Sequence, residues 1–276
     1  MCDHEKAKMV CVKCVPAGPV LVGATDMGGA LATVEAFLAD GAHHYLCFCE
    51  GNLLSYAASD AQIRRILREA DLVLADGIAV AIMARLGGSP LPERIPGPSF
   101  LPAACEYGVA KGWRHFFYGG AEGVADRLAG NLRAKFPGVR IVGTYSPPFR
   151  SLTDDEERRV KDLIETARPH LLWVALGSPK QEVWVAEHVG TIDVPVMLPV
   201  GAAFDFHSGN RPWAPTWVRK IGMEWLFRTF TGGRRTFCRN CRCVIVVLCM
   251  VLLGLVRMRV LRKPFTATSE KGHRRD

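Results

Sequence analysis

The sequence lacks the signatures of several protein classes. No Gly-x-Gly-x-x-Gly turn follows the first apolar run, where Gly23-Ala24-Thr25-Asp26-Met27-Gly28-Gly29 stands instead. This absence argues against a dinucleotide-dependent oxidoreductase. No Asp-x-Asp pair of the metal-chelating kind occurs, so we expect arginine, lysine and N–H groups, rather than a metal or another cofactor, to neutralise a bound anion. Residues 1–6 lack the basic-then-apolar pattern of an export signal, and we therefore expect a cytosolic chain with reduced thiols.

The net positive charge lies in the C-terminal tail. From residue 227 to the end there are twelve Lys and Arg side chains against Glu270 and Asp276, so the tail accounts for the whole net charge of +8. A basic surface extending over the whole domain is missing, and we expect no nucleic-acid partner. A basic tail beside an apolar segment fits an anionic membrane surface instead.

The ten cysteines allow one metal-binding alternative. Cys11-x-x-Cys14 and Cys238-x-x-Cys241-x-Cys243 together could supply a zinc tetrad. However, about 220 residues separate the two sets, and the second adjoins an apolar run. We expect ordinary reduced thiols and no metal.

The overall composition is that of a folded protein, with 49% hydrophobic and 22% charged residues over 276 positions. Residues 1–18 show no clear periodicity and are expected to form a loose leader. Between residues 19 and 205, apolar runs of strand length alternate with amphipathic helical patterns. This alternation predicts a Rossmann-like α/β core, with a mostly parallel sheet and helices on both faces. Residues 206–276 are expected to form a helical, membrane-associating C-terminal appendage.

Several elements can be placed individually. Strands are expected at 115–118, 139–145, 171–176 and 194–200, and helices at 122–135, 154–167 and 217–230. Thr153 and Glu156 have the spacing of a capping box, which places the start of the 154–167 helix. Gly232-Gly233-Arg234-Arg235 is expected to end the last of these helices.

Residues 244–256 contain no charge and lie between Arg242 and Arg257. As a helix this run would reach about 20 Å, short of the roughly 30 Å hydrocarbon core of a bilayer. A segment lying in the interface of the cytoplasmic leaflet is therefore expected. A short span with its flanking cations reaching the headgroups, and a helix packed in a soluble core, are the two alternatives.

Two strand ends carry the candidate functional residues. The apolar run Leu171-Leu172-Trp173-Val174-Ala175-Leu176 precedes Gly177-Ser178-Pro179-Lys180-Gln181-Glu182, a pattern typical of a strand, a tight turn and a helix N-terminus. Unpaired N–H groups and the helix dipole favour a phosphate there, beside Lys180 and Gln181. Asp76-Gly77 ends a second apolar run, at the position where open α/β sheets place their ligand crevice. Both ends could share one cleft.

Six motifs occur in an order that resembles one enzyme family. They are Ala75-Asp76-Gly77, Pro92-Glu93-Arg94-Ile95-Pro96-Gly97, Gly177-Ser178-Pro179-Lys180-Gln181-Glu182, Gly201-Ala202-Ala203-Phe204-Asp205-Phe206, Ala214-Pro215-x-Trp217 and Gly222-Met223-Glu224-Trp225-Leu226-Phe227-Arg228. Over residues 20–235 the chain resembles the WecG/TagA/CpsF family of bacterial glycosyltransferases (glycosyltransferase family 26).

The resemblance implies an inverting hexosyltransferase. Such enzymes move a sugar, N-acetylmannosamine or its uronic acid in the best-known members, from a UDP-sugar to a saccharide on undecaprenyl diphosphate. Their products are cell-surface polysaccharides, teichoic acid linkage units and exopolysaccharides. The implied location is peripheral, at the cytoplasmic face of the bacterial plasma membrane. The implied partners are the UDP-sugar, the polyprenyl-diphosphate-linked acceptor and the anionic membrane surface, and a second copy of the chain is a further candidate.

The resemblance also implies roles for individual residues. Asp76 is the expected base that takes the acceptor's proton, and a helix N-cap is its alternative role. Arg94 and Gln181 are expected to line the same pocket, with a solvated charge and a helix cap as their respective alternatives. The other expected substrate-binding residues are Asn52, Gly177, Lys180, Glu182, Arg228, Arg234 and Arg235. The three arginines belong to an appendage thought to close over the site, although a solvated or membrane-facing basic run would explain them equally.

Two departures from the family pattern leave the donor sugar open. Many relatives carry Thr or Asn where this chain has Cys47-Phe48-Cys49-Glu50-Gly51-Asn52, and many carry Asp where it has Ser99. Both positions lie near the expected donor pocket. The alternative to an active transferase is a membrane-bound scaffold that binds a nucleotide sugar without catalysis.

Overall fold

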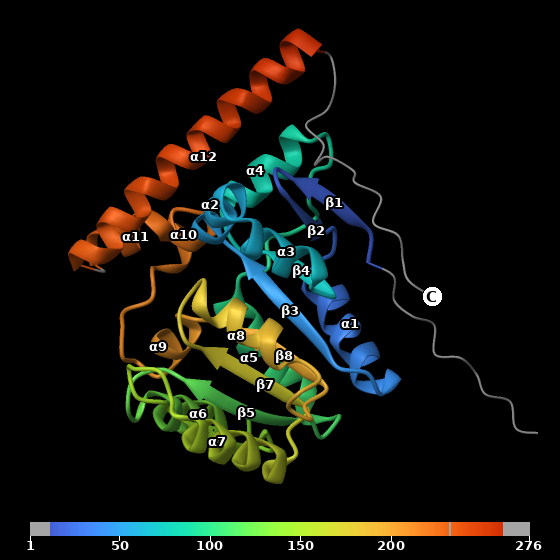
Figure 1. The fold of residues 1–276 in the computed structure, drawn as a ribbon, viewed down its shortest axis with the longest axis vertical. Coiled ribbons are helices and arrows are strands. Elements are labelled where there is room, and N and C mark those ends of the chain that lie inside the picture. Colours follow the sequence, from blue (N-terminus) through green and yellow to red (C-terminus); the bar gives the residue numbers. More distant parts are fainter. Residues whose placement is uncertain (1–11, 232, 262–276) are drawn as a thin grey trace, which may run out of the picture.

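A six-stranded parallel sheet forms the centre of the molecule (Figure 1). The computed structural model describes residues 12–231 and 233–261. The strand order is β4-β3-β8-β7-β5-β6, and every neighbouring pair is parallel. The strands are β3 (His44–Cys49), β4 (Leu72–Ala75), β5 (Arg114–Gly119), β6 (Arg140–Tyr145), β7 (Leu171–Ala175) and β8 (Val196–Pro199). The predicted Rossmann-like α/β fold is confirmed.

Continuous apolar runs form these strands because a parallel sheet covered by helices is buried on both faces. Every residue of β3, β4 and β8 is buried. One face packs on α2 (Gly51–Ser59), α3 (Ala61–Glu69), α4 (Ile78–Leu86), α7 (Asp154–Ala167) and α8 (Lys180–His188). The other face packs on α1 (Met27–Asp40), α5 (Gly97–Val109), α6 (Val124–Lys135) and α9 (Ala203–His207). The boundary expected at residue 205 falls inside α9.

A β-hairpin precedes the sheet, and its first strand lies inside residues 1–18, which we expected to form a loose leader. β1 (Cys14–Ala17) pairs antiparallel with β2 (Val20–Gly23). Val15 and Ala17 are buried in the same core as α2 and α3, because alternate residues of a strand point to the same side. Four residues are too few to produce a clear periodicity in the sequence. Residues 1–11 of the expected leader lie outside the described residues.

The helix expected at 217–230 is two helices, so that prediction was wrong. α10 (Thr216–Lys220) and α11 (Glu224–Thr231) are separated by Gly222. Gly222 has a φ of +77°, and a Cβ there would lie 2.9 Å from Cδ1 of Ile78. Only glycine permits both this left-handed turn and such a close approach to the start of α4.

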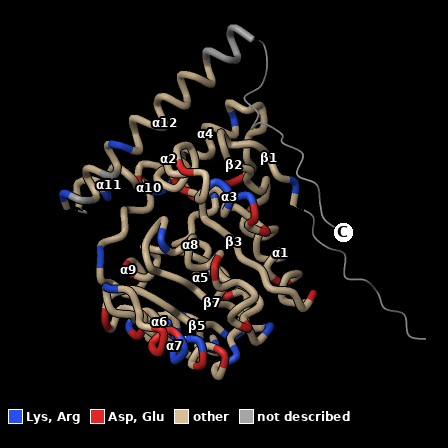
Figure 2. The backbone as a smooth tube through the Cα atoms, in the orientation of Figure 1, with Lys and Arg blue, Asp and Glu red and all other residues tan. Residues whose placement is uncertain are grey.

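The C-terminal part of the described chain is one long helix, α12 (Gly233–Leu261), of 29 residues. Residues 244–256 are therefore the middle of a helix about 43 Å long, not an isolated segment. α12 packs beside α2, α4 and α11 and lies at the opposite end of the molecule from α6 and α7 (Figure 1). Figure 2 shows few charged residues along α12, whereas α6 and α7 carry many.

Only a narrow stripe of α12 is covered by the rest of the molecule. Asn240, Met250 and Gly254 are buried, while Leu248 and Leu252 are 55% and 61% exposed. Within the described residues, Thr236–Leu255 is long and apolar enough to cross a membrane, and 18% of it is buried. Packing in a soluble core, one of the alternatives for residues 244–256, is therefore not the arrangement of this helix.

Candidate active site

The ends of four parallel strands meet at one edge of the sheet. The N–H of Asp76, just after β4, donates to the carbonyl of Cys49 at the end of β3 at 2.9 Å. The N–H of Val200, after β8, donates to the carbonyl of Val174 in β7, also at 2.9 Å. The segments that carry the sequence motifs therefore share the carboxyl edge of the sheet, where open α/β sheets bind ligands.

Asp76 is a partly buried carboxylate at this edge. Its Oδ2 accepts a hydrogen bond from the N–H of Gly97, at the start of α5, at 3.1 Å. Burial raises the pKa of Asp76 to about 7, and the carboxylates of Glu224 and Glu50 act in the same direction. The Gly97 N–H and the Arg228 guanidinium oppose the rise. Asp76 can therefore both accept and release a proton near neutral pH.

The alternative roles of Asp76 and Arg94 do not describe this structure. Gly77, and not Asp76, is the N-cap of α4. Arg94 is not a freely solvated charge, since its Nη2 donates to the carbonyl of Arg219 in α10 at 3.0 Å. Its Nη1 donates to the carbonyl of Asp76 at 3.4 Å. Arg94 thus joins the end of β4 to the C-terminal appendage.

The Gly177 motif forms the turn and helix start that the sequence predicts. Lys180 is exposed at the start of α8, and Gln181 and Glu182 are buried. Oε1 of Gln181 accepts from the N–H of Gly177 at 3.2 Å, so Gln181 does serve the local turn. Its Nε2 donates to Oε1 of Glu182 at 2.8 Å, and burial raises the pKa of Glu182 to about 7. A Cβ on Gly201 would lie 3.2 Å from Oε1 of Gln181, so the β8–α9 turn faces this side chain.

Asn52 lies at the first turn of α2, held by polar contacts on two sides. Its Nδ2 donates to Oε2 of Glu50 at 3.1 Å and to Oδ1 of Asn240 in α12 at 3.4 Å. Its Oδ1 is buried and accepts no hydrogen bond from the described part of the chain. Sequence reasoning overlooked Glu50, which caps α2 through the N–H groups of Asn52 and Leu53. Glu50 could have been recognised as a helix cap because it stands one residue before a helical pattern.

The arginines of the C-terminal appendage differ in their surroundings. Arg228 in α11 lines a cavity of about 240 Å³ together with Ala202, Arg211 and Thr236. Its guanidinium carbon lies 5.7 Å from the centre of the Phe206 ring. Arg234 is exposed at the start of α12, and the side chain of Arg235 lies outside the part that can be described. Arg211, which the sequence analysis did not single out, therefore belongs with Arg228.

No group of three His, Cys, Asp or Glu side chains that could hold a metal ion is present among the described residues. Cys11, half of one pair in the zinc alternative, lies outside them. The site thus consists of Asp76 and further carboxylates, Arg94 and Arg228, and the start of α8. The chain is thus an α/β protein whose candidate site lies at the carboxyl ends of its strands, where open α/β sheets bind ligands.

The family follows from direct comparison with known proteins. Residues 17–261 match the glycosyl transferase WecG/TagA/CpsF family, and the chain belongs to that family. The resemblance drawn from the six motifs is confirmed, and so is the enzyme class, a hexosyltransferase that serves cell-surface polymer synthesis.

Three relatives share the name N-acetylglucosaminyldiphosphoundecaprenol N-acetyl-beta-D-mannosaminyltransferase. The protein of Bacillus spizizenii is 32% identical over 179 residues, which cover 65% of this chain and 68% of the relative. That of Bacillus subtilis is 29% identical over 172 residues, covering 62% and 65%. That of Staphylococcus aureus is 24% identical over 213 residues, covering 76% and 82%. These relatives act on a lipid-linked substrate, which points to membrane association for the family.

Proposed function

We propose that this chain transfers an N-acetylmannosamine-like or other hexose from a UDP-sugar to N-acetylglucosamine on undecaprenyl diphosphate, with inversion at the sugar carbon. The names of the relatives support this acceptor and this class of sugar. The carboxylate and the arginines at the carboxyl edge of the sheet support the chemistry.

The single observation that carries the proposal is the carboxylate of Asp76. An acceptor hydroxyl oxygen forms a bond to C1 of the donor sugar while the bond from C1 to the diphosphate oxygen breaks. Asp76 takes the hydroxyl proton, and UDP leaves with the electron pair of the broken bond. A base with a pKa of about 7 suits this step, because it is partly ionised at neutral pH and still holds a proton well.

The departing diphosphate requires cations or N–H groups aimed at it. Arg228 and Arg211 line the 240 Å³ cavity beside Ala202, and Lys180 is exposed at the N-terminus of α8. We place the diphosphate between these groups, with Arg234 and Arg235 as further contacts. The donor pocket in this proposal is lined by Asn52, Arg94, Gly177, Gln181 and Glu182.

The appendage places the enzyme at its lipid substrate in this proposal. The outward face of α12 is apolar, and basic residues lie near its start. A helix with these properties lies in the interface of a membrane that carries anionic lipids. We propose a peripheral enzyme on the cytoplasmic face, where nucleotide sugars are available, and a spanning α12 is the alternative.

The test is transfer from a panel of radiolabelled UDP-sugars to N-acetylglucosamine and glucose on undecaprenyl diphosphate. Membranes carrying the wild-type chain are compared with membranes carrying Asp76→Asn. We expect product with at least one donor and a loss of roughly 10²-fold or more in the variant, since a general base contributes about that much. UDP binding by both proteins without any transfer would favour the scaffold role.

A further inference from the structure

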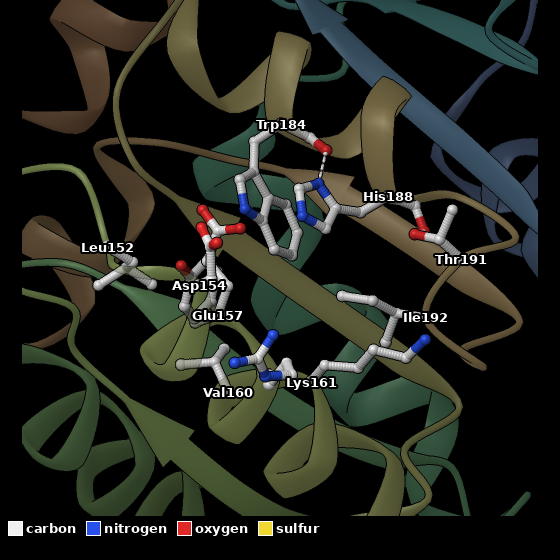
Figure 3. Close-up of a pocket in the computed structure, with 11 residues that line it drawn as sticks. Leu152, Asp154, Glu157, Val160, Lys161, Trp184, His188, Thr191 and Ile192 are labelled. Atoms are coloured by element: carbon white, nitrogen blue, oxygen red, sulfur yellow. Dashed lines mark hydrogen bonds between the residues drawn. The ribbon is translucent and has the colours of Figure 1, made fainter.

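A second cavity lies away from Asp76, between α7 and α8. Its volume is about 330 Å³, at the small end of the roughly 300–1,000 Å³ range of small-molecule sites. Figure 3 shows Trp184 and His188 on one side of the hollow and Val160, Lys161 and Ile192 on the other. Trp184 and His188 belong to α8, whose first turn carries Gln181 and Glu182 at the carboxyl edge. The cavity thus adjoins the transfer site without being part of it.

Stacked aromatic rings form one wall of this cavity. The rings of Trp184 and His188 are 4.1 Å apart at an angle of 14°, and those of Trp184 and Tyr118 are 4.7 Å apart at 33°. Tyr118 in turn stacks with Tyr145, at 6.1 Å and 12°. Nδ1 of His188 contacts the carbonyl of Trp184 at 2.7 Å, which holds the imidazole in place. The wall therefore consists of aromatic rings that pack on one another.

Tyr118 contributes a hydroxyl group to the cavity lining. Tyr118 is only 2% exposed but lines the cavity, and its hydroxyl is not among the buried side-chain atoms that lack a partner in the described part of the chain. Burial raises the pKa of Tyr118 above its usual range, with the nearby Glu157 acting in the same direction. The hydroxyl is therefore neutral and keeps its proton as a donor. Because Tyr118 lines the cavity, a ligand there can accept a hydrogen bond from this hydroxyl.

Some charged side chains on the α7 side of the cavity are in ion pairs, and others are free to contact a ligand. Nζ of Lys161 lies 3.8 Å from Oε1 of Glu165, and Arg158 pairs with Asp155. Asp154 and Glu157, in the first turn of α7, form no ion pair with any described residue. The polar groups that a ligand could use thus include two carboxylates that accept hydrogen bonds and one hydroxyl that donates.

We propose that this cavity is a second, non-catalytic saccharide-binding site, for one neutral pyranose ring of the hexose or N-acetylhexosamine class. The C–H face of a pyranose packs on aromatic rings, and its hydroxyls donate to carboxylates and accept from Tyr118. An anion is disfavoured by Asp154 and Glu157, and a purely apolar ligand by the four charged side chains around the cavity. This site is independent of the proposed donor and acceptor chemistry.

Calorimetric titration of the full chain in detergent with glucose, mannose, N-acetylglucosamine and N-acetylmannosamine tests the site. We expect saturable binding of at least one sugar, unchanged by excess UDP. Tyr118→Phe keeps the ring stack and removes only the hydroxyl, and Glu157→Gln removes only a charge. Each is expected to weaken binding by about threefold to tenfold, the effect of one hydrogen bond. Asp162→Asn, an exposed change on the same helix that lies outside the cavity lining, is expected to bind like the wild type.

Three results would overturn the proposal: no saturable binding of any of the four sugars, equal affinity of both cavity variants and the wild type, or competition by UDP, which would place the sugar at the transfer site. Circular dichroism and thermal unfolding of each variant separate lost binding from lost folding. Sugar binding is measured without donor or lipid acceptor. Its outcome can therefore be interpreted even if the transfer assay yields no product.

Discussion

Asp76 lies among charges of both signs, and these set the pH at which it can act as a base. Its pKa of about 7 means that the carboxylate gains its charge as the pH rises through neutrality. The free enzyme should therefore lose kcat/KM below about pH 7 and gain it above, with a slope of one proton.

The Glu224→Gln variant tests this account of the titration. Removing a negative neighbour favours the ionised form of Asp76, so its pKa falls and the acidic limb of the profile moves to lower pH. Profiles of kcat/KM between pH 5.5 and 9 for the wild type and Glu224→Gln measure the shift. Glu187→Gln, an exposed change on α8, is the control. An acidic limb at the same pH in wild type and Glu224→Gln would contradict this account.

At the residue scale, local sequence indicated the groups that end a strand or begin a helix. Asp76 and the Gly177 motif were accessible because an apolar run stops at each of them. Glu224 and Arg211 were not singled out as site residues. Both belong to the C-terminal appendage, and only the fold places them near the carboxyl edge.

Among the elements, α12 is tied to the site by one buried amide. Oδ1 of Asn240 accepts from Asn52, and its Nδ2 donates to Oγ1 of Thr229 at 2.7 Å and to the carbonyl of Trp225 at 3.2 Å. We expect Asn240→Leu to leave these partners unsatisfied, at a cost of about 1–3 kcal/mol in the free energy of unfolding. The KM for the UDP-sugar should rise because Asn52 loses a positioning contact.

Thermal unfolding and donor KM measured on the same preparations check the role of Asn240. Cys249→Ser, an exposed change on α12, controls for a general effect of altering the helix. Unchanged values of both quantities in Asn240→Leu would show that the amide does not hold α12 on α2.

The turn between α10 and α11 gives a second prediction at this scale. We expect Gly222→Ala to destabilise the fold by about 1–3 kcal/mol, because φ is +77° and the new Cβ would crowd Ile78. Gly130→Ala is the matched control. It lies in α6 with open space around its Cβ position, so it should stabilise by roughly 0.5–1 kcal/mol. Chemical denaturation of both variants measures the difference, and effects of the same sign would refute the argument.

Whether an element could be predicted from the sequence depended on whether its cause is local. The α7 helix begins where expected because Thr153 and Glu156 form a complete capping box. The β1–β2 hairpin and the break at Gly222 were missed. The first depends on burial against α2 and α3, and the second on contact with Ile78. Both causes are contacts between segments far apart in the chain, and the sequence alone does not reveal such contacts.

On the scale of the whole molecule, charged residues are many along α6 and α7 and few along α12 (Figure 2), where exposed leucines lie. We expect the double variant Leu248→Glu, Leu252→Glu to lose association with vesicles that contain anionic lipids. A leucine side chain buried in apolar surroundings contributes roughly 1.5–3 kcal/mol, so a decrease of at least tenfold is expected. Flotation of the purified chain with such vesicles measures it.

A matched control makes the same leucine-to-glutamate change at the opposite end of the molecule, in α7. Leu163 in α7 is 44% exposed, and Leu163→Glu should leave flotation unaltered. Equal flotation of the double variant and the wild type would remove the proposed membrane role of α12.

The position of β8 has a consequence for how the chain is made. β8 is the last strand of the described sheet in sequence, yet it lies between β3 and β7 and so joins the two halves of the sheet. On the ribosome, each half must wait with an open edge until residues 196–199 emerge. Unpaired strand edges promote association between chains. The nascent protein is therefore most exposed to aggregation just before β8 is inserted, and a truncation ahead of Val196 would make that exposure permanent.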